Sequence, residues 1–364
     1  MKHTPITVSA SSRKLPPASP VFVSYWKFAE ERQRIFFRRL RGDALLTTDS
    51  VLAKYRFTNA YRASDRVSQY LIRHVIYTGD QSFDEVFFRT LLFKLFNRIA
   101  TWELLTRELG PINYRTFSVE RYSKILDDAM RRGERIYSAA YIMPMASGMP
   151  GKRKHETHLR LLQLMMQKQA AAQISDKPDM ASAFRVLRQY PMMGEFLAYQ
   201  YITDLNYSSI TRFSEMDFVV AGPGARDGIR KCFPSLNGWT ENDIIRSVTD
   251  HQDKHFAELG ISFSSLWGRP LQLIDCQNLF CEISKYARVA HPDILGNSGR
   301  TKIKQNFTIN PEPLECWYPP KWELNQKCST PIDTPFCEDT TPPLVKPCTS
   351  PSFYQPALPF SQPQ

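Results

Sequence analysis

The chain has 364 residues, of which 42% are apolar, and it carries a formal net charge of +11 with a pI near 9.3. No apolar run approaches the roughly 18 residues that span a membrane, and the start Met1-Lys-His-Thr-Pro lacks the apolar core of a signal peptide, so neither a membrane protein nor a secreted one is expected. Seven cysteines, an odd number, then indicate reduced thiols in an intracellular protein, which would be nuclear in a eukaryote.

The composition divides the chain into three parts. Residues 1–20 are rich in Pro, Ser and Lys, and residues 329–364 in Pro, Ser and Thr, so both ends are predicted to be disordered tails. Residues 21–328 are predicted to form one mainly α-helical domain. Apolar residues at helical spacing predict helices over 22–40, from Asp49 onward, and over 65–77, 82–96, 101–108, 119–132, 155–173, 182–189 and 194–205. Runs at 217–221 and 270–275 are the best strand candidates, which gives an α fold with minor β.

The segment 54–73 mixes cations, rings and amides. Its members are Arg56, Arg62, Arg66 and Arg73, the rings Tyr55, Phe57, Tyr61 and Tyr70, and the polar Asn59, Asp65 and Gln69. Arginine forks suit phosphates, aromatic faces suit exposed bases, and amides suit base edges. The segment therefore predicts a nucleic-acid partner, and the excess of arginine from residue 32 to 66 supports a polyanion.

A helical hairpin is predicted around Gly194, because one helix ends at Pro191 and a second begins directly after the glycine. Backbone N–H groups at such a turn can hold a DNA phosphate, as in helix–hairpin–helix proteins, although an ordinary αα-hairpin has the same pattern. DNA glycosylases with this hairpin carry a catalytic Asp about twenty residues later, where Asp217 lies here with Glu215 close by. Phe196 stands where a lyase-type glycosylase has Lys, so Schiff-base chemistry is not expected there.

A glycine cluster follows the run at 217–221. Gly222, Gly224 and Gly228 precede Ile229-Arg-Lys, where a helix is expected to begin, so the backbone together with Arg230 and Lys231 would hold an anion; a tight structural turn is the alternative. The spacing fits neither GxGxxG nor a Walker A motif, so ATP-dependent kinase activity is not expected from this chain alone. The His and Cys spacings are too weak to predict a metal site, and no cofactor is implied.

Polar residues also gather between positions 275 and 285. Asn278, Glu282 and Lys285 share a helical face, with Asp275 and Gln277 just before them. Asn278 and Glu282 could bind a base or an amine, and Asp275 could act as a base or orient one. The alternative is a helix cap at Asp275 followed by a surface Glu–Lys pair.

These segments together resemble one known family. The residues that carry the resemblance are Tyr25-Trp-Lys-Phe, Glu31-Arg-Gln-Arg, Tyr55-Arg-Phe-Thr-Asn, Tyr61-Arg, Asp65-Arg-Val-Ser-Gln, Phe88-Arg, Phe93-Lys-Leu-Phe-Asn, Thr101-Trp-Glu, Ile136-Tyr-Ser-Ala-Ala-Tyr, Ala221-Gly-Pro-Gly-Ala, Asp275-Cys-Gln-Asn and Cys281-Glu-Ile-Ser-Lys-Tyr. The family is the helical domain of the 5-hydroxymethyluracil DNA kinases, together with the related α-glutamyl/putrescinyl thymine pyrophosphorylases. The resemblance covers roughly residues 22 to 325 and implies a fold similar to that of DNA glycosylases.

The resemblance implies DNA with a modified thymine as the substrate. A stand-alone helical domain would hold a flipped, activated 5-substituted uracil and replace its phosphate with an amine or amino acid. In that reaction Asp217 or Asp275, with Glu282 nearby, would deprotonate the nucleophile, and Arg56, Arg62 and Lys94 would neutralise the leaving phosphate. Arg89, from one of the matching motifs, joins the expected DNA contacts.

Two other functions stay open. One is a non-catalytic reader of modified DNA that recruits a separate kinase or a TET/JBP-type oxygenase, and the other is a glycosylase. Under any of them, the segment 54–73 would form one wall of a base pocket. We therefore expect five of its side chains to be partly buried and bonded to one another: Arg56, Asn59, Arg62, Asp65 and Gln69.

Overall fold

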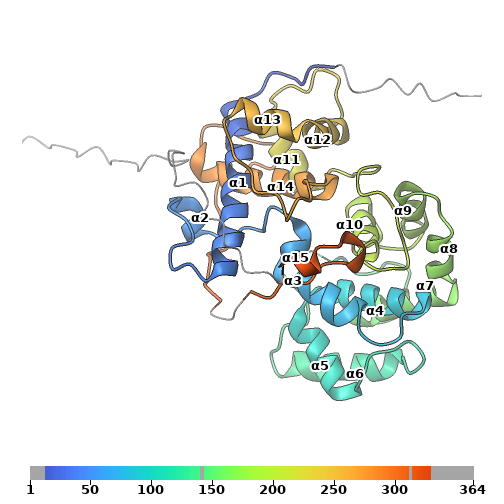
Figure 1. The fold of residues 1–364 in the computed structure, drawn as a ribbon. Coiled ribbons are helices and arrows are strands. Elements are labelled where there is room, and N and C mark those ends of the chain that lie inside the picture. Colours follow the sequence, from blue (N-terminus) through green and yellow to red (C-terminus); the bar gives the residue numbers. More distant parts are fainter. Residues whose placement is uncertain (1–12, 140–142, 311–313, 329–364) are drawn as a thin grey trace, which may run out of the picture.

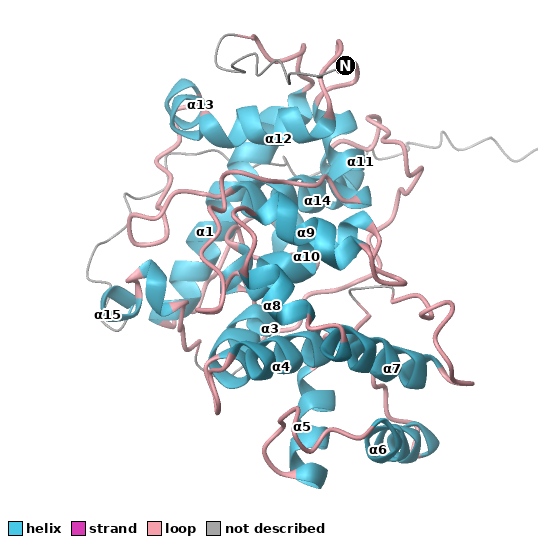
Figure 2. Ribbon diagram, turned by 90° about the vertical axis from the view of Figure 1, so that its right-hand side faces the viewer, coloured by secondary structure: helices cyan, strands magenta, loops and turns pink. Residues whose placement is uncertain are grey.

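The computed structural model describes residues 13–139, 143–310 and 314–328, and helices form nearly all of its regular structure (Figures 1 and 2). In chain order the α-helices are α1 (Pro20–Arg41), α2 (Ser50–Lys54), α3 (Arg66–Tyr70), α4 (Phe83–Phe96), α5 (Ile99–Leu109), α6 (Val119–Arg131), α7 (Lys154–Gln167), α8 (Ala170–Ser175), α9 (Met180–Arg188), α10 (Glu195–Leu205), α11 (Pro223–Cys232), α12 (Glu241–Asp250), α13 (Gln252–Glu258), α14 (Leu273–Ala290) and α15 (Asn325–Cys328). A π-helical stretch, Leu71–Ile76, continues α3, and 3-10 turns lie at Arg62–Ser64 and Pro320–Trp322.

The predicted mainly α fold is confirmed, and its minor β component is wrong. Within the described ranges the only extended pairings are two isolated bridges, Tyr55 with Asn306 and Leu266 with Arg269. The apolar run at 217–221 packs into the core without a partner strand, and the run at 270–275 leads into α14. None of the described helices has the length and apolarity needed to cross a membrane.

Most of the two predicted tails, residues 1–12 and 329–364, lies outside the described residues. Residues 13–19 are described and run along the molecule. There the Arg13 guanidinium donates to the carbonyl of Asn237 at 2.6 Å, and the Ser19 N–H donates to the carbonyl of Cys232 at 2.8 Å.

Local sequence signals place several helix ends. Ser19 caps α1 before Pro20, and Gly42 ends it with a φ of +81°, which suits glycine. Asp49 caps α2 as predicted, since one carboxylate oxygen accepts the N–H groups of Val51 and Leu52 at 2.8 and 2.9 Å. The single helix predicted over 155–173 is wrong: it breaks into α7 and α8 at Gln169, whose φ is +53°.

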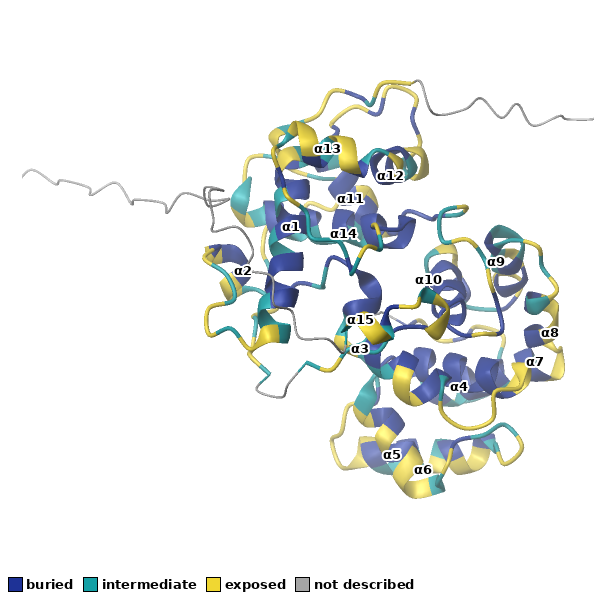
Figure 3. Cartoon of the chain, in the orientation of Figure 1, coloured by how far each residue is buried: buried dark blue, intermediate teal, exposed yellow. Residues whose placement is uncertain are grey.

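The helices form two groups that meet at the 3-10 turn Arg62–Ser64 and at α3 (Figure 1). One group contains α1, α2 and α11–α14, and the other contains α4–α10. In the second group α4 contacts α5, α7, α8 and α10, and every residue from Glu85 to Phe96 is buried (Figure 3). Because α4 is buried on all sides, it serves as the core of its group.

Candidate functional site

A cavity of about 630 Å³ opens between α1, α3 and α5, at the junction of the two helix groups. This volume falls within the roughly 300–1,000 Å³ typical of small-molecule sites. Four arginines line it, Arg32, Arg39, Arg66 and Arg73, against two glutamates, Glu103 and Glu315. The remaining lining side chains are polar or aromatic (Asn59, Ser64, Gln69, Tyr70, His74, Asn310, Phe36 and Phe307) or aliphatic (Ile35, Leu46, Ile99 and Leu314).

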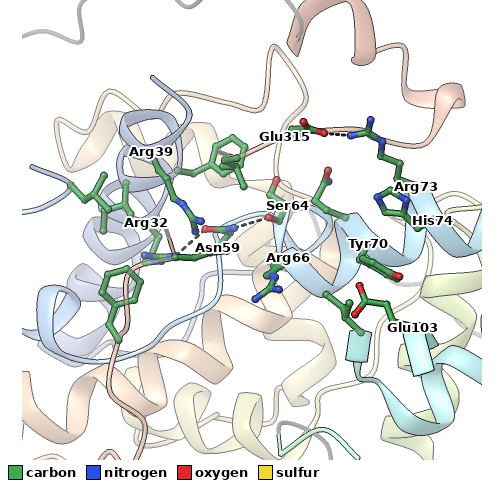
Figure 4. A pocket seen from close by; sticks show the side chains of 18 residues that line it. Arg32, Arg39, Asn59, Ser64, Arg66, Tyr70, Arg73, His74, Glu103 and Glu315 are labelled. Atoms are coloured by element: carbon green, nitrogen blue, oxygen red, sulfur yellow. Dashed lines mark hydrogen bonds and ion pairs between the residues drawn. The ribbon is translucent and has the colours of Figure 1, made fainter. Parts of the chain in front are cut away.

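The arginines enter the cavity from different elements. Figure 4 shows Arg32 and Arg39 of α1 on one side, and Arg73 and His74 on the other. Both Arg73 and His74 belong to the π-helical stretch, a rare conformation that often occurs at functional sites. Arg73 pairs with Glu315, whereas neither Arg39 nor Arg66 makes a side-chain ion pair with any residue that the structure describes. A cavity of this kind favours an anionic ligand.

One wall of the cavity is aromatic. The Tyr70 ring lies 4.9 Å from the His74 ring and stacks on Phe93 at 5.9 Å. Partial burial, together with the Glu103 carboxylate to which its hydroxyl donates, raises the pKa of Tyr70 to about 12. A flat ring placed against Tyr70 and His74 would find aromatic surface for stacking.

The segment 54–73, predicted to form one wall of a base pocket, supplies part of the lining of this cavity. Asn59 accepts from the Arg32 guanidinium at 2.9 Å and donates to the carbonyl of Ser64 at 2.8 Å (Figure 4). Gln69 donates to the carbonyl of Ala63 at 2.7 Å and accepts the N–H of Trp317 at 2.7 Å. The amides thus fix the shape of the wall.

Asp65 lies behind the wall, between the lining residues Ser64 and Arg66. One of its oxygens accepts the N–H of Asn59 at 2.8 Å. Burial and the nearby Glu282 charge raise the pKa of Asp65 to about 7, against the opposing effects of that hydrogen bond, Arg32 and Arg62. Of the five side chains expected to be buried and mutually bonded, Asn59 and Asp65 are joined, and Arg62 and Gln69 are buried with other partners. The expectation is wrong for Arg56, which is exposed.

Replacing Asp65 by Asn tests this environment through the pH dependence of stability. Because the folded-state pKa is raised, the carboxyl stabilises the fold fully below pH 3.8, and this contribution is lost as pH rises to about 7. We expect the Tm of Asp65→Asn to rise relative to the native chain across that window, as measured by circular dichroism. Asp179→Asn is the control of opposite sign, because hydrogen bonds from Ser182 lower the pKa of Asp179. Parallel profiles of Tm against pH for Asp65→Asn and the native chain would contradict the raised pKa of Asp65.

Arg62 and Lys94, predicted to face a phosphate, instead share one buried carboxylate. Asp204 of α10 accepts from both η nitrogens of Arg62, at 2.7 and 3.0 Å, and lies 3.0 Å from the Lys94 ammonium. Arg62 also donates to Gln200 and to the Tyr207 hydroxyl, and only about 3% of its surface is exposed. Arg62 thus ties the 3-10 turn Arg62–Ser64 to α10, Lys94 ties α4 to α10, and neither cation lines the cavity.

The predicted catalytic carboxylates lie outside the lining of the cavity. Asp275 is buried, and its two oxygens accept the N–H groups of Arg62 and Gln272 at 2.8 and 2.9 Å, while burial raises its pKa to about 6. Glu282 accepts the N–H of Thr58 at 3.1 Å and pairs with Lys285 at 2.8 Å. Asp217 is exposed in the loop before α11. The alternative of a helix cap and a Glu–Lys pair therefore describes the contacts of the 275–285 cluster.

Several other predicted contacts serve helix packing. Arg89 is buried and donates to the carbonyls of Val75, Ile76 and Asp80. Lys231 is buried and donates to the carbonyl of Ser284, and Arg230 pairs with Glu241. Gln277 is buried beside Gln200, and Asn278 is half-buried on α14.

The glycine cluster is placed differently from the prediction. The helix α11 begins at Pro223 rather than Ile229, so Gly224 and Gly228 lie inside it and Gly222 caps it. A Cβ on Gly222 would lie 2.6 Å from the Phe196 ring, and one on Gly224 would lie 2.7 Å from the Cys281 sulfur. Within the described part of the chain, these glycines allow α11 to approach its neighbours. Gly194 caps α10 at the exposed turn of the α9–α10 hairpin.

Sequence reasoning did not select the following as site residues: Arg32, Arg39, His74, Glu103, Phe307, Asn310, Leu314 and Glu315. The charge excess on α1 pointed to its two arginines. No local signal linked these last four residues to α3, because they are remote from it in sequence. Backbone pairing of Gln305 and Phe307 with residues 54–56, and the Trp317 N–H on Gln69, hold the chain there.

The geometry defines an all-α domain with an arginine-lined cavity at the junction of its two helix groups. The family model described as "5-hmdU DNA kinase, helical domain" matches residues 19–296, so the chain belongs to that family. Neither the curated proteins nor the solved structures gave a match. The family relates the chain to 5-hydroxymethyluracil in DNA.

Proposed function

We propose that the chain binds DNA carrying a 5-substituted uracil and takes that nucleotide, turned out of the helix, into the cavity between α1, α3 and α5. The arginine lining beside the Tyr70 and His74 rings is the observation that carries the proposal. Arg39 and Arg66 would bind the phosphates, and the base would stack on the aromatic wall. Turning a nucleotide out of a duplex costs a few kcal/mol, which these contacts would offset.

The chemistry we propose is group transfer at the 5-methylene carbon. An amine nitrogen of an amine or amino acid would form a bond to that carbon, while the carbon–oxygen bond to an activating phosphate breaks and the phosphate leaves with the electron pair. A carboxylate would take the proton from the nitrogen. Of the three proposed bases, Glu282 has the best position, since it binds the backbone next to Asn59; the oxygens of Asp275 are already occupied by backbone N–H groups.

A second candidate is a reader that binds the modified base and recruits a separate kinase or a TET/JBP-type oxygenase. The position of Asp217, Asp275 and Glu282 outside the cavity lining favours this function. In either case the α9–α10 hairpin, with Gly194 at its turn, would add a phosphate contact of the helix–hairpin–helix type, as in DNA glycosylases.

Reversing the charge of Arg66 tests the binding step. We expect Arg66→Glu to weaken binding of a duplex containing 5-hydroxymethyluracil by about tenfold or more, as a lost charge-assisted phosphate contact would. Fluorescence anisotropy at one fixed salt concentration would measure this. Arg131→Glu on α6 is the matched control, and the native chain should prefer the modified duplex over one with thymine. Equal affinity of Arg66→Glu and the control, or no preference by the native chain, would overturn the proposal.

Mass spectrometry of nucleosides separates the chemistries. DNA with 5-hydroxymethyluracil, with and without prior phosphorylation of the base, would be incubated with the chain and an amine. A new adduct supports transfer, a free base supports excision, and unchanged nucleosides beside tight binding support the reader.

A further inference from the structure

A basic segment follows α14 and lies beyond the residues that match the family. Residues 297–307 read NSGRTKIKQNF, with Arg300, Lys302 and Lys304 at every second position. No acidic residue occurs between 294 and 310. The family match ends at residue 296, so these cations are a feature of this chain outside the matched part.

The structure anchors this segment at three places. The Ser298 N–H donates to Asp227 of α11 at 2.6 Å, and Arg288 of α14 donates to the carbonyl of Lys302 at 3.1 Å. Farther along, the segment pairs with residues 54–56: Arg56 N–H donates to the Gln305 carbonyl and Phe307 N–H to the Lys54 carbonyl, both at 3.0 Å. The backbone that carries these cations is therefore held against the rest of the molecule.

Residues 54–56 and 300–306, the basic ribbon, carry five exposed cations. None of the five forms an ion pair with a side chain in the described ranges, and the ribbon itself contains no carboxylate. The cations are Lys54, Arg56, Arg300, Lys302 and Lys304. A positive surface without internal neutralisation attracts a polyanion.

The ribbon leads directly to the cavity. Phe307, which pairs with Lys54, is a lining residue of the cavity, and so is Asn310 three residues on. A polyanion lying along the ribbon would thus have one of its units at the cavity mouth, beside Arg39 and Arg66. A DNA strand with one nucleotide turned out has this geometry, because its flanking phosphates continue past the extruded base.

We propose that the basic ribbon binds the phosphate backbone of the DNA next to the nucleotide that enters the cavity. The inference rests on the proposed function for the identity of that nucleotide. The ribbon would supply affinity without reading sequence, since phosphate contacts carry no base information. Specificity for the modified base would stay with the cavity.

The full chain with Arg300→Gln, Lys302→Gln and Lys304→Gln tests the ribbon. Anisotropy titrations with a duplex containing 5-hydroxymethyluracil, over a series of salt concentrations, give the slope of log K against log salt. Each lost phosphate contact lowers that slope by about 0.9. We expect the triple variant to bind at least tenfold more weakly at low salt, with a slope reduced by about two or more and an unchanged preference for the modified base.

A matched triple variant, Lys124→Gln, Arg131→Gln and Lys168→Gln, removes the same charge from α6 and the end of α7. It should leave the slope unchanged. Equal slopes for the two triple variants would show that the basic ribbon does not bind the DNA backbone. Binding of a partner other than DNA to this surface would also overturn the proposal. Failure of the proposed function is a separate outcome: the native chain would bind modified and unmodified duplexes equally, whatever the ribbon variant does to the salt slope.

Discussion

Replacing Arg62 by alanine is expected to lower the free energy of unfolding by about 3–5 kcal/mol, because it removes one partner from a buried ion cluster. Its guanidinium is shared among Asp204, Gln200 and the Tyr207 hydroxyl, and its backbone N–H donates to Asp275. Without the side chain, buried acceptors lose their donor and a void forms between the 3-10 turn Arg62–Ser64 and α10. Thermal and urea unfolding, followed by circular dichroism, would measure the loss.

The same substitution decides between two roles for this arginine. Arg230→Ala is the control, since Arg230 pairs with Glu241 nearer the surface, where an ion pair contributes up to about 1 kcal/mol. If Arg62→Ala unfolded like the native chain but lost affinity for DNA, the contact with a phosphate predicted from sequence would be correct and the structural role wrong.

Gly228→Ala is expected to destabilise the fold by about 3 kcal/mol through a steric clash between two helices. A Cβ at this position of α11 would lie 1.9 Å from the backbone oxygen of Phe280 in α14, and backbone atoms cannot move aside as the end of a side chain can. The gain in helix propensity, about 1 kcal/mol, offsets only part of the cost. Urea unfolding at constant pH would give the difference.

Gly194→Ala is the matched control, since a Cβ added at Gly194 would meet no other atom within 4 Å and the φ of −61° there suits alanine. Its cost should be that of a changed N-cap, about 1 kcal/mol or less. A Gly228→Ala protein as stable as Gly194→Ala would mean that α11 and α14 can separate without loss.

Local patterns predicted the helices well and their tertiary roles poorly. The apolar spacing and caps of α1, α4 and α6 are encoded within each segment, so their bounds agree with expectation to within a few residues. The burial of Arg62 depends on Asp204, which is remote in sequence, and residue type alone does not distinguish an arginine on a phosphate from one on a buried carboxylate. The run at 217–221 has the composition of a strand, but Val219, Val220 and Ala221 are buried in the core and its backbone forms no ladder with any described residue.

The part of the cavity that comes from one local segment could be predicted from sequence, and the parts that come from distant segments could not. The segment 54–73 concentrates its cations, rings and amides locally, so Asn59, Arg66 and Gln69 were selected from sequence and do line the cavity. The other lining residues come from α1, α5 and the described residues Phe307, Asn310, Leu314 and Glu315, and only the folded chain brings them together. Glycines that permit close helix packing also have the same sequence pattern as glycines that admit a ligand, which explains the different outcome at Gly222 and Gly224.

The cavity is built from both ends of the described chain, with Arg32 on one wall and Glu315 on another, and Trp317 and Tyr318 bonded to Gln69 and Ser64. During synthesis at roughly 5–20 residues per second, Glu315 is therefore added on the order of ten to sixty seconds after Arg32. Until then the nascent chain carries the arginines of α1 and α3 without their closing segment. The site is thus completed only after residue 315 has been added, and a chain interrupted before that residue would leave the ribosome with an open, incomplete cavity.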